Sequence, residues 1–143
     1  MVDRRISLAT LAAMFAGVLI GPSAFAQTRT SLENRSEAQL ARALDGRVAG
    51  KPVDCLNLRD IRSSRIIDRA AILYETHGDT LYLNRPDAGQ SSLNRGDVLV
   101  TDTHSQQLCS IDVVHLYDTS LHMRTGVVFL GDFVPYRKPD RNR

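Results

Sequence analysis

From residue 53 onward the sequence consists of short β-prone runs separated by turn residues, and this pattern limits the fold more than any other feature. Residues 71–76 and 80–84 are two such runs, and His77, Gly78 and Asp79 between them are typical of a compact hairpin turn. Further runs occupy residues 53–59, 65–68, 97–101, 108–117, 127–130 and 133–136. The clearest alternation, in residues 108–117, places on one face Cys109, Ile111, Val113, His115 and Tyr117. These runs predict a mainly β fold of about six or seven strands, an antiparallel barrel or sandwich.

One short helix is expected before these strands. Ser36 suits the N-cap of a helix, and Gln39 three residues later completes a capping box. Gly46 suits the position just beyond a helix C-terminus, so we predict a helix over residues 37–45, after a loose polar stretch over residues 27–34. The chain then divides into an N-terminal segment (27–52), a β-rich domain (53–136) and a disordered charged tail (137–143).

The N-terminal 26 residues have the pattern of a cleaved bacterial signal peptide. Arg4 and Arg5 precede an uncharged, mostly apolar run over residues 6–20, and Ala24 and Ala26 form a small-x-small cleavage site. A membrane anchor is the alternative, but the run is shorter than the ~20 apolar residues that a span requires. We therefore expect a periplasmic or secreted protein without a transmembrane segment after cleavage.

Cys55 and Cys109 are the two cysteines of the chain. In an oxidising compartment an even pair is most simply a disulfide, and two free thiols or a redox or metal-binding pair are the alternatives. Neither cysteine belongs to a Cys-x-x-Cys motif, and no histidine stands at a close zinc-ligand spacing from either one. We therefore expect a structural disulfide, and no metal or cofactor.

The net charge of the chain does not indicate a class of binding partner. The 143 residues carry a formal net charge of +2, which excludes a strongly basic nucleic-acid-binding domain. The densest basic stretch contains Arg59, Arg62 and Arg65, and guanidinium groups suit bidentate recognition of anions. Asp60 and Asp68 are interleaved with these arginines, so surface ion pairs are the alternative to an anion-binding site.

No catalytic motif is evident in the sequence. A Gly-x-Ser-x-Gly elbow, a glycine-rich phosphate loop and an EF-hand loop are all absent. A non-enzymatic module that binds an envelope protein or a small ligand, or serves an accessory role in the envelope, is therefore the leading hypothesis. The alternatives are a small periplasmic hydrolase that uses His104 or His115 with a carboxylate and a hydroxyl, and a carrier of a small ligand or metal.

Four stretches occur in an order that characterises a known family. They are Cys-Leu-Asn-Leu-Arg-Asp-Ile-Arg-Ser (55–63), Tyr-Leu-Asn-Arg (82–85), Leu-Cys-Ser-Ile-Asp (108–112) and Leu-Gly-Asp-Phe-Val-Pro-Tyr (130–136). Over residues 55–136 the chain thus resembles a family of small exported bacterial proteins known only as a domain of unknown function. Members often carry two further cysteines, where this chain has Ser91 or Ser92 and the apolar residues 127–129. The resemblance implies that Cys55 pairs with Cys109, and it supplies no activity.

Overall fold

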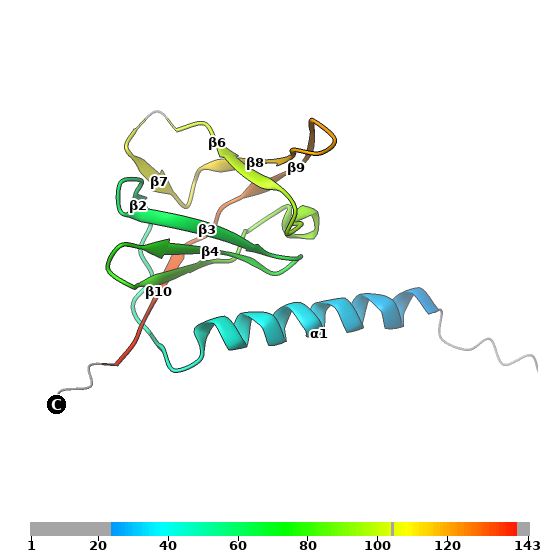
Figure 1. The fold of residues 1–143 in the computed structure, drawn as a ribbon, viewed down its shortest axis with the longest axis horizontal. Helices are drawn as coiled ribbons and strands as arrows, with labels where there is room; N and C mark the ends of the chain where they lie inside the picture. The colour runs from blue at the N-terminus through cyan, green and yellow to red at the C-terminus, as the bar shows by residue number, and fades with distance from the viewer. Residues whose placement is uncertain (1–23, 104, 140–143) are drawn as a thin grey trace, which may run out of the picture.

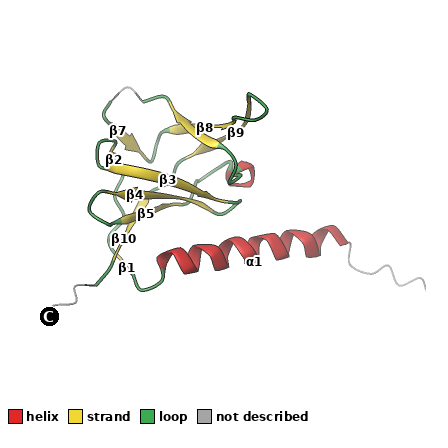
Figure 2. Ribbon diagram, in the orientation of Figure 1, coloured by secondary structure: helices red, strands yellow, loops and turns green. Residues whose placement is uncertain are grey.

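The computed structural model describes residues 24–103 and 105–139, which form one helix, ten strands and a single 3-10 turn (Figures 1 and 2). The helix is α1 (Ala24–Leu44), and the turn is η1 (Gln90–Ser92) between β5 and β6. The strands are β1 (Val48–Ala49), β2 (Cys55–Asn57), β3 (Ile61–Ile67), β4 (Ala71–Thr76), β5 (Leu81–Asn84), β6 (Val98–Thr101), β7 (Gln107–Cys109), β8 (Val113–Asp118), β9 (Met123–Phe129) and β10 (Phe133–Arg137). The mainly β prediction is confirmed.

The strands form three antiparallel sheets, and in the described part of the chain none of them closes into a barrel. The largest sheet has the order β1-β10-β5-β4-β3, the second has the order β6-β8-β9, and β2 pairs with β7. Two mutual hydrogen bonds between the backbones of Val53 and Phe133, each 2.9 Å long, tie the segment before β2 to the five-stranded sheet.

The five-stranded sheet lies between α1 on one side and the two smaller sheets on the other, and its central strands β4 and β5 are buried on both faces (Figure 1). β4 shows this most clearly, because Ile72 and Tyr74 face the core between the sheets, whereas Ala71 and Leu73 pack in the cluster that includes Leu40 of α1. A strand covered on both faces needs no alternation of polar and apolar residues. The core between the sheets consists of Leu56, Ile66, Ile72, Tyr74, Leu93, Leu108, Val114, Leu116, Val128, Leu130 and Phe133.

α1 is longer than the sequence predicts. The expected N-cap, Ser36, lies inside the helix and is 8% exposed, and residues 27–34, expected to be loose, are helical. The physical reason is that residues 24–35 contain no glycine or proline and are rich in good helix formers, so nothing stops the helix from extending toward the N-terminus. The C-terminal prediction is confirmed, because the helix ends at Leu44 and Gly46 adopts a left-handed φ of 68°.

The rest of the predicted signal segment and most of the predicted tail are not part of this description. Residues 1–23 and 140–143 lie outside the described residues, and residues 24–26 begin α1. Arg137 ends β10 opposite Val48, and Lys138 forms an ion pair with Asp79 at 3.0 Å, so both residues belong to the fold. Within residues 24–103 and 105–139, no helix has the length and apolar character that crossing a membrane requires.

The predicted strand over residues 108–117 is divided in two. Asp112 creates the break, because its Oδ2 accepts a hydrogen bond from the Cys109 backbone N–H at 2.7 Å, and its own N–H donates to the Cys109 carbonyl at 3.0 Å. An aspartate that bonds its neighbouring backbone in this way favours a turn over a continuous ladder. β7 therefore pairs with β2, while β8 joins a different sheet. The prediction also missed β1, a two-residue strand.

Candidate functional site

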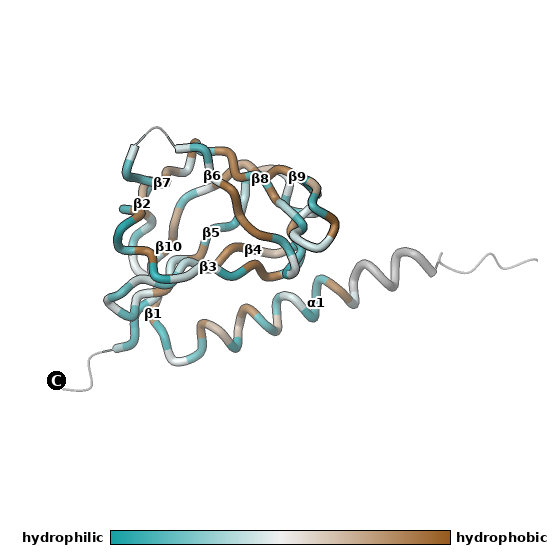
Figure 3. The backbone as a smooth tube through the Cα atoms, turned by 45° about the horizontal axis from the view of Figure 1, so that its top comes forward, coloured by the Kyte–Doolittle hydropathy of each residue, from teal (hydrophilic) through white to brown (hydrophobic). Residues whose placement is uncertain are grey.

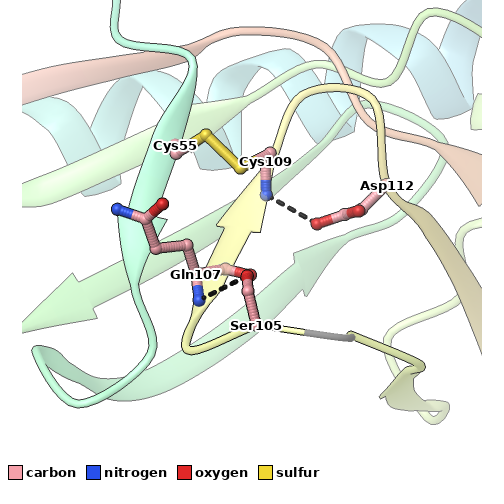
Figure 4. Close-up of a disulfide and its surroundings, with 5 residues drawn as sticks. All are labelled: Cys55, Ser105, Gln107, Cys109 and Asp112. Carbon is pink, nitrogen blue, oxygen red and sulfur yellow. Dashed lines mark hydrogen bonds between the residues drawn. A yellow bond between two sulfur atoms is a disulfide. The ribbon is translucent and has the colours of Figure 1, made fainter.

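The disulfide is confirmed, and it fastens the small two-stranded sheet. Cys55 and Cys109 are directly opposite each other in β2 and β7, with their Cα atoms 4.0 Å apart and their sulfurs bonded (Figure 4). The next pair, Leu56 and Leu108, carries this sheet into the core. Beyond the bond, the Gln107 N–H donates to Ser105 Oγ at 3.1 Å. The cysteines are therefore structural, and this part of the molecule holds no free thiol.

The three arginines of the predicted anion site have different surroundings. Arg59 follows β2 in a turn, and Arg62 forms a short ion pair with Glu75 on the neighbouring strand β4. Arg65 lines two shallow grooves that neither Arg59 nor Arg62 reaches. Arg62 thus forms an ion pair, although with Glu75 and not with Asp60 or Asp68, and the anion-binding role of the three arginines stays a prediction.

Of the two histidines proposed for hydrolysis, the structure describes only His115. His104 lies outside the described residues. His115 lies on β8 opposite Val100 and Val127, and its imidazole forms no hydrogen bond or ion pair with any described residue. Over the same part of the chain, no three His, Cys, Asp or Glu side chains gather closely enough to hold a metal ion.

The outer face of the β6-β8-β9 sheet is mostly apolar and partly exposed. Val114, Leu116 and Val128 point inward and are fully buried, so the alternate residues point away from the core. Among these outward residues, Val98 is 48% exposed and Val100 is 46% exposed. The other members of this outer face are Val113, His115, Tyr117, Val127 and Phe129, with the exposed Arg124 opposite Tyr117. Figure 3 shows the hydrophobic colour along β6. A sheet with one face in the core normally carries polar residues on the other, so this outer face is a candidate interaction surface.

The two edge strands of this sheet, β6 and β9, differ in whether other backbone segments pair with them. The edge at β9 is covered at its C-terminal end, because the Asp87 N–H donates to the Phe129 carbonyl at 2.9 Å and the Phe129 N–H donates to the Ala88 carbonyl at 3.0 Å. Gly89 makes this approach feasible, since it has a φ of 79° and a Cβ there would lie 2.2 Å from the Val127 carbonyl oxygen. β6 pairs only with β8 and is the open edge.

β6 also lacks the features that protect an edge strand from pairing. β3, at the edge of the five-stranded sheet, contains a bulge and two charged residues, Arg62 and Arg65. Charges and bulges are the usual means by which proteins discourage pairing at a sheet edge. β6 has the sequence Val-Leu-Val-Thr, with no charge, no proline and a regular register against β8. Of these two edges, only β6 is suited to accept another strand.

A groove of about 280 Å³ separates the open edges of β3 and β6. Ser64, Arg65 and Ile66 form one side of it, and Val98 and Leu99 form the other. Asp97 lies beside β6 in this groove and is 8% exposed. Its Oδ2 accepts a hydrogen bond from Thr125 Oγ1 at 2.5 Å, while its Oδ1 has no partner among the described residues. The groove therefore combines an open backbone edge with an acceptor that is not fully satisfied.

Sequence reasoning did not identify this surface, although a signal for it was present. Val113, His115 and Tyr117 were placed on one face by their alternation, but the sequence does not say that this face points to solvent. The uncharged run in residues 98–100 is the useful signal, because an edge strand without a charge or proline is unusual. No protein-family model, no curated protein and no solved structure was found to match this chain.

Proposed function

We propose that this chain is a small exported binding module, not an enzyme, that accepts an extended segment of an envelope protein along β6. The observation that carries the proposal is the open, uncharged edge of β6 beside an exposed apolar face that includes Val98 and Val100. In such strand addition, backbone hydrogen bonds supply affinity, and side chains at alternate positions supply specificity. Residues on the incoming segment would lie beside Val98 and Val100 and cover their exposed surface.

Several features support export and the class of fold. A disulfide persists in the periplasm and outside the cell, where thiols are not kept reduced. The packing of the five-stranded sheet against the two smaller sheets supports a sandwich as the fold class. We retain as part of this proposal the signal peptide over residues 1–26, a periplasmic or secreted location, and the resemblance over residues 55–136 to the family of small exported proteins.

A different protein is a better occupant than a second copy of this chain. Pairing of two β6 strands would join only residues Val98–Thr101 of each copy, and β6 ends beside the polar residues 102–103. Such a contact is short compared with a specific interface, which buries about 1,200–2,000 Å² in total. A partner with a longer extended segment can continue over the apolar outer face toward Phe129, which is 48% exposed.

Site-specific photo-crosslinking in the native envelope tests this proposal. A photo-reactive residue at Val100 should capture a distinct envelope protein, whereas the same residue at Ile111, which is 88% exposed but lies in the turn before β8, should not. A second experiment places the photo-reactive residue at Phe129 and combines it with Val98→Lys and Val100→Lys. Capture from position 129 should then fall at least tenfold relative to the protein that keeps both valines. Thermal unfolding and an intact disulfide should show that this variant folds. Equal capture from positions 100 and 111, insensitivity to the lysines, or a product of two copies of this chain would overturn the proposal.

A further inference from the structure

A second hollow lies between α1 and the loop that contains η1, and it shares one lining residue, Arg95, with the groove beside β6. It has a volume of about 500 Å³ and is bounded by one face of α1, the turn between β3 and β4, and residues 91–95. Arg35 comes from α1, Arg69 from the turn, and Arg95 from the loop. We call this hollow the arginine pocket. Three elements far apart in the sequence thus bring three guanidinium groups to one cavity.

Of the three guanidinium groups, only that of Arg95 contacts another described side chain. Arg95 Nη2 lies 3.1 Å from Asp68 Oδ2 and 3.2 Å from Gln39 Oε1, and its backbone N–H donates to Asp68 Oδ1 at 2.6 Å. The guanidinium groups of Arg35 and Arg69 form no hydrogen bond or ion pair with any described residue. Asp68 is the single carboxylate that lines the pocket, and Arg95 already neutralises it. The pocket therefore holds positive charge that the described residues leave uncompensated.

The walls of the pocket are fastened to one another independently of any ligand. The Arg69 N–H donates to the Leu93 carbonyl at 3.1 Å, and Gln90 Nε2 donates to the Ala70 carbonyl at 2.6 Å. α1 is held by Leu40, which is 3% exposed in the cluster beneath the helix. Because these contacts fix the backbone that carries the arginines, little ordering of the backbone would be needed on binding.

We propose that the arginine pocket binds a small oxyanion ligand, a molecule that carries a phosphate or carboxylate group. The planar guanidinium presents paired N–H donors that match the oxygens of both groups, which is why arginine is preferred over lysine at such sites. Arg35 and Arg69 are the primary contacts, and the hydroxyls of Ser36 and Ser92 line the same pocket as additional donors. This site differs from the one around Arg59, Arg62 and Arg65 that the sequence suggested, and no residue of β6 lines it.

Calorimetric titration of the full chain with inorganic phosphate and, separately, with citrate tests this proposal. Sodium chloride keeps the ionic strength constant, because general screening alone weakens exposed charge interactions. At least one anion should give saturable heat and raise the melting temperature, as ligand binding to the native state requires. The tighter of the two anions identifies the head group.

Matched glutamine variants locate the site. Arg35→Gln and Arg69→Gln should each weaken binding at least tenfold and leave the melting temperature without ligand nearly unchanged. Arg42→Gln is the control, since Arg42 is exposed on the same helix and does not line the pocket. No saturable heat with either anion, or an equal loss of affinity in Arg42→Gln, would overturn the proposal. Neither result would bear on strand addition at β6, so the two proposals fail independently.

Discussion

Removal of the disulfide by Cys55→Ala together with Cys109→Ala should cost about 4 kcal/mol of the free energy of unfolding. The two cysteines are separated by 54 positions, and the chain-entropy model assigns about 4 kcal/mol to the closure of a loop of that length. A domain of this size is commonly stable by about 5–15 kcal/mol, so the loss is a large share of the total. Alanine is the better replacement because it leaves no buried hydroxyl in the partly buried pair.

Urea denaturation followed by circular dichroism measures this loss. With a slope of about 1–2 kcal/mol per molar urea, the midpoint should fall by about 2–4 M relative to the oxidised protein. The wild-type protein in excess reductant is the control, and its midpoint should fall to that of the double variant. A loss below about 1 kcal/mol would refute the reasoning, because it would mean that the β2–β7 pairing and the core already restrict this loop without the bond.

Three further perturbations test the packing. Phe133→Ala should destabilise the fold by about 3–5 kcal/mol, measured by urea denaturation, because this fully buried ring lies in the core between the sheets. Gly89→Ala should lower the melting temperature sharply, since a Cβ would lie 2.2 Å from the Val127 carbonyl oxygen at a φ of 79°. Glu37→Gln should cost little at pH 7, and chemical denaturation at lower pH should show that this cost disappears, because the hydrogen-bonded ion pair with Arg85 lowers the pKa of Glu37.

The pH dependence expected for Glu37→Gln follows from the direction in which the pKa of Glu37 is shifted. A carboxyl whose pKa is lower in the folded protein contributes stability above its unfolded pKa, and it loses that contribution as the pH falls through the folded value. Glu37 and Arg85 are joined by contacts of 2.8 and 2.9 Å at a half-exposed position. A cost of Glu37→Gln that stays constant as the pH falls through the folded pKa of Glu37 would contradict the assignment to the ion pair.

An unchanged melting temperature in Gly89→Ala would show that the loop before η1 can move away from β9.

The strands that are covered on two faces or joined by a tight turn were predictable from the sequence. β4 matches its predicted bounds, and β5 follows the hairpin turn at His77, Gly78 and Asp79. Asp79 adopts a left-handed φ of 58°, a conformation that aspartate tolerates in turns. Local sequence is sufficient in such regions because the turn and the hydrophobic runs specify the same register.

The regions where prediction was wrong depend on contacts distant in the sequence. Ser36 resembles an N-cap, but whether a helix begins there depends on the preceding residues and on packing against the sheet. The break at Asp112 depends on a hydrogen bond to Cys109. It also depends on the pairing of β7 with β2, which places β7 outside the sheet that contains β8. The arginine pocket unites Arg35 with Arg69 and Arg95, and periodicity within a single segment contains no information about that juxtaposition.

Amide hydrogen exchange at β6 tests the central claim most directly. The full chain would be measured alone and in complex with the protein captured from position 100, and exchange would be followed for β6 (Val98–Thr101) and β3 (Ile61–Ile67). Strand addition predicts strong new protection of those β6 amides whose N–H groups point away from β8, with β3 unchanged. The reason is that a new ladder of backbone hydrogen bonds covers only the open edge of β6. Protection confined to β3 or α1, with β6 exchanging as in the free protein, would contradict it.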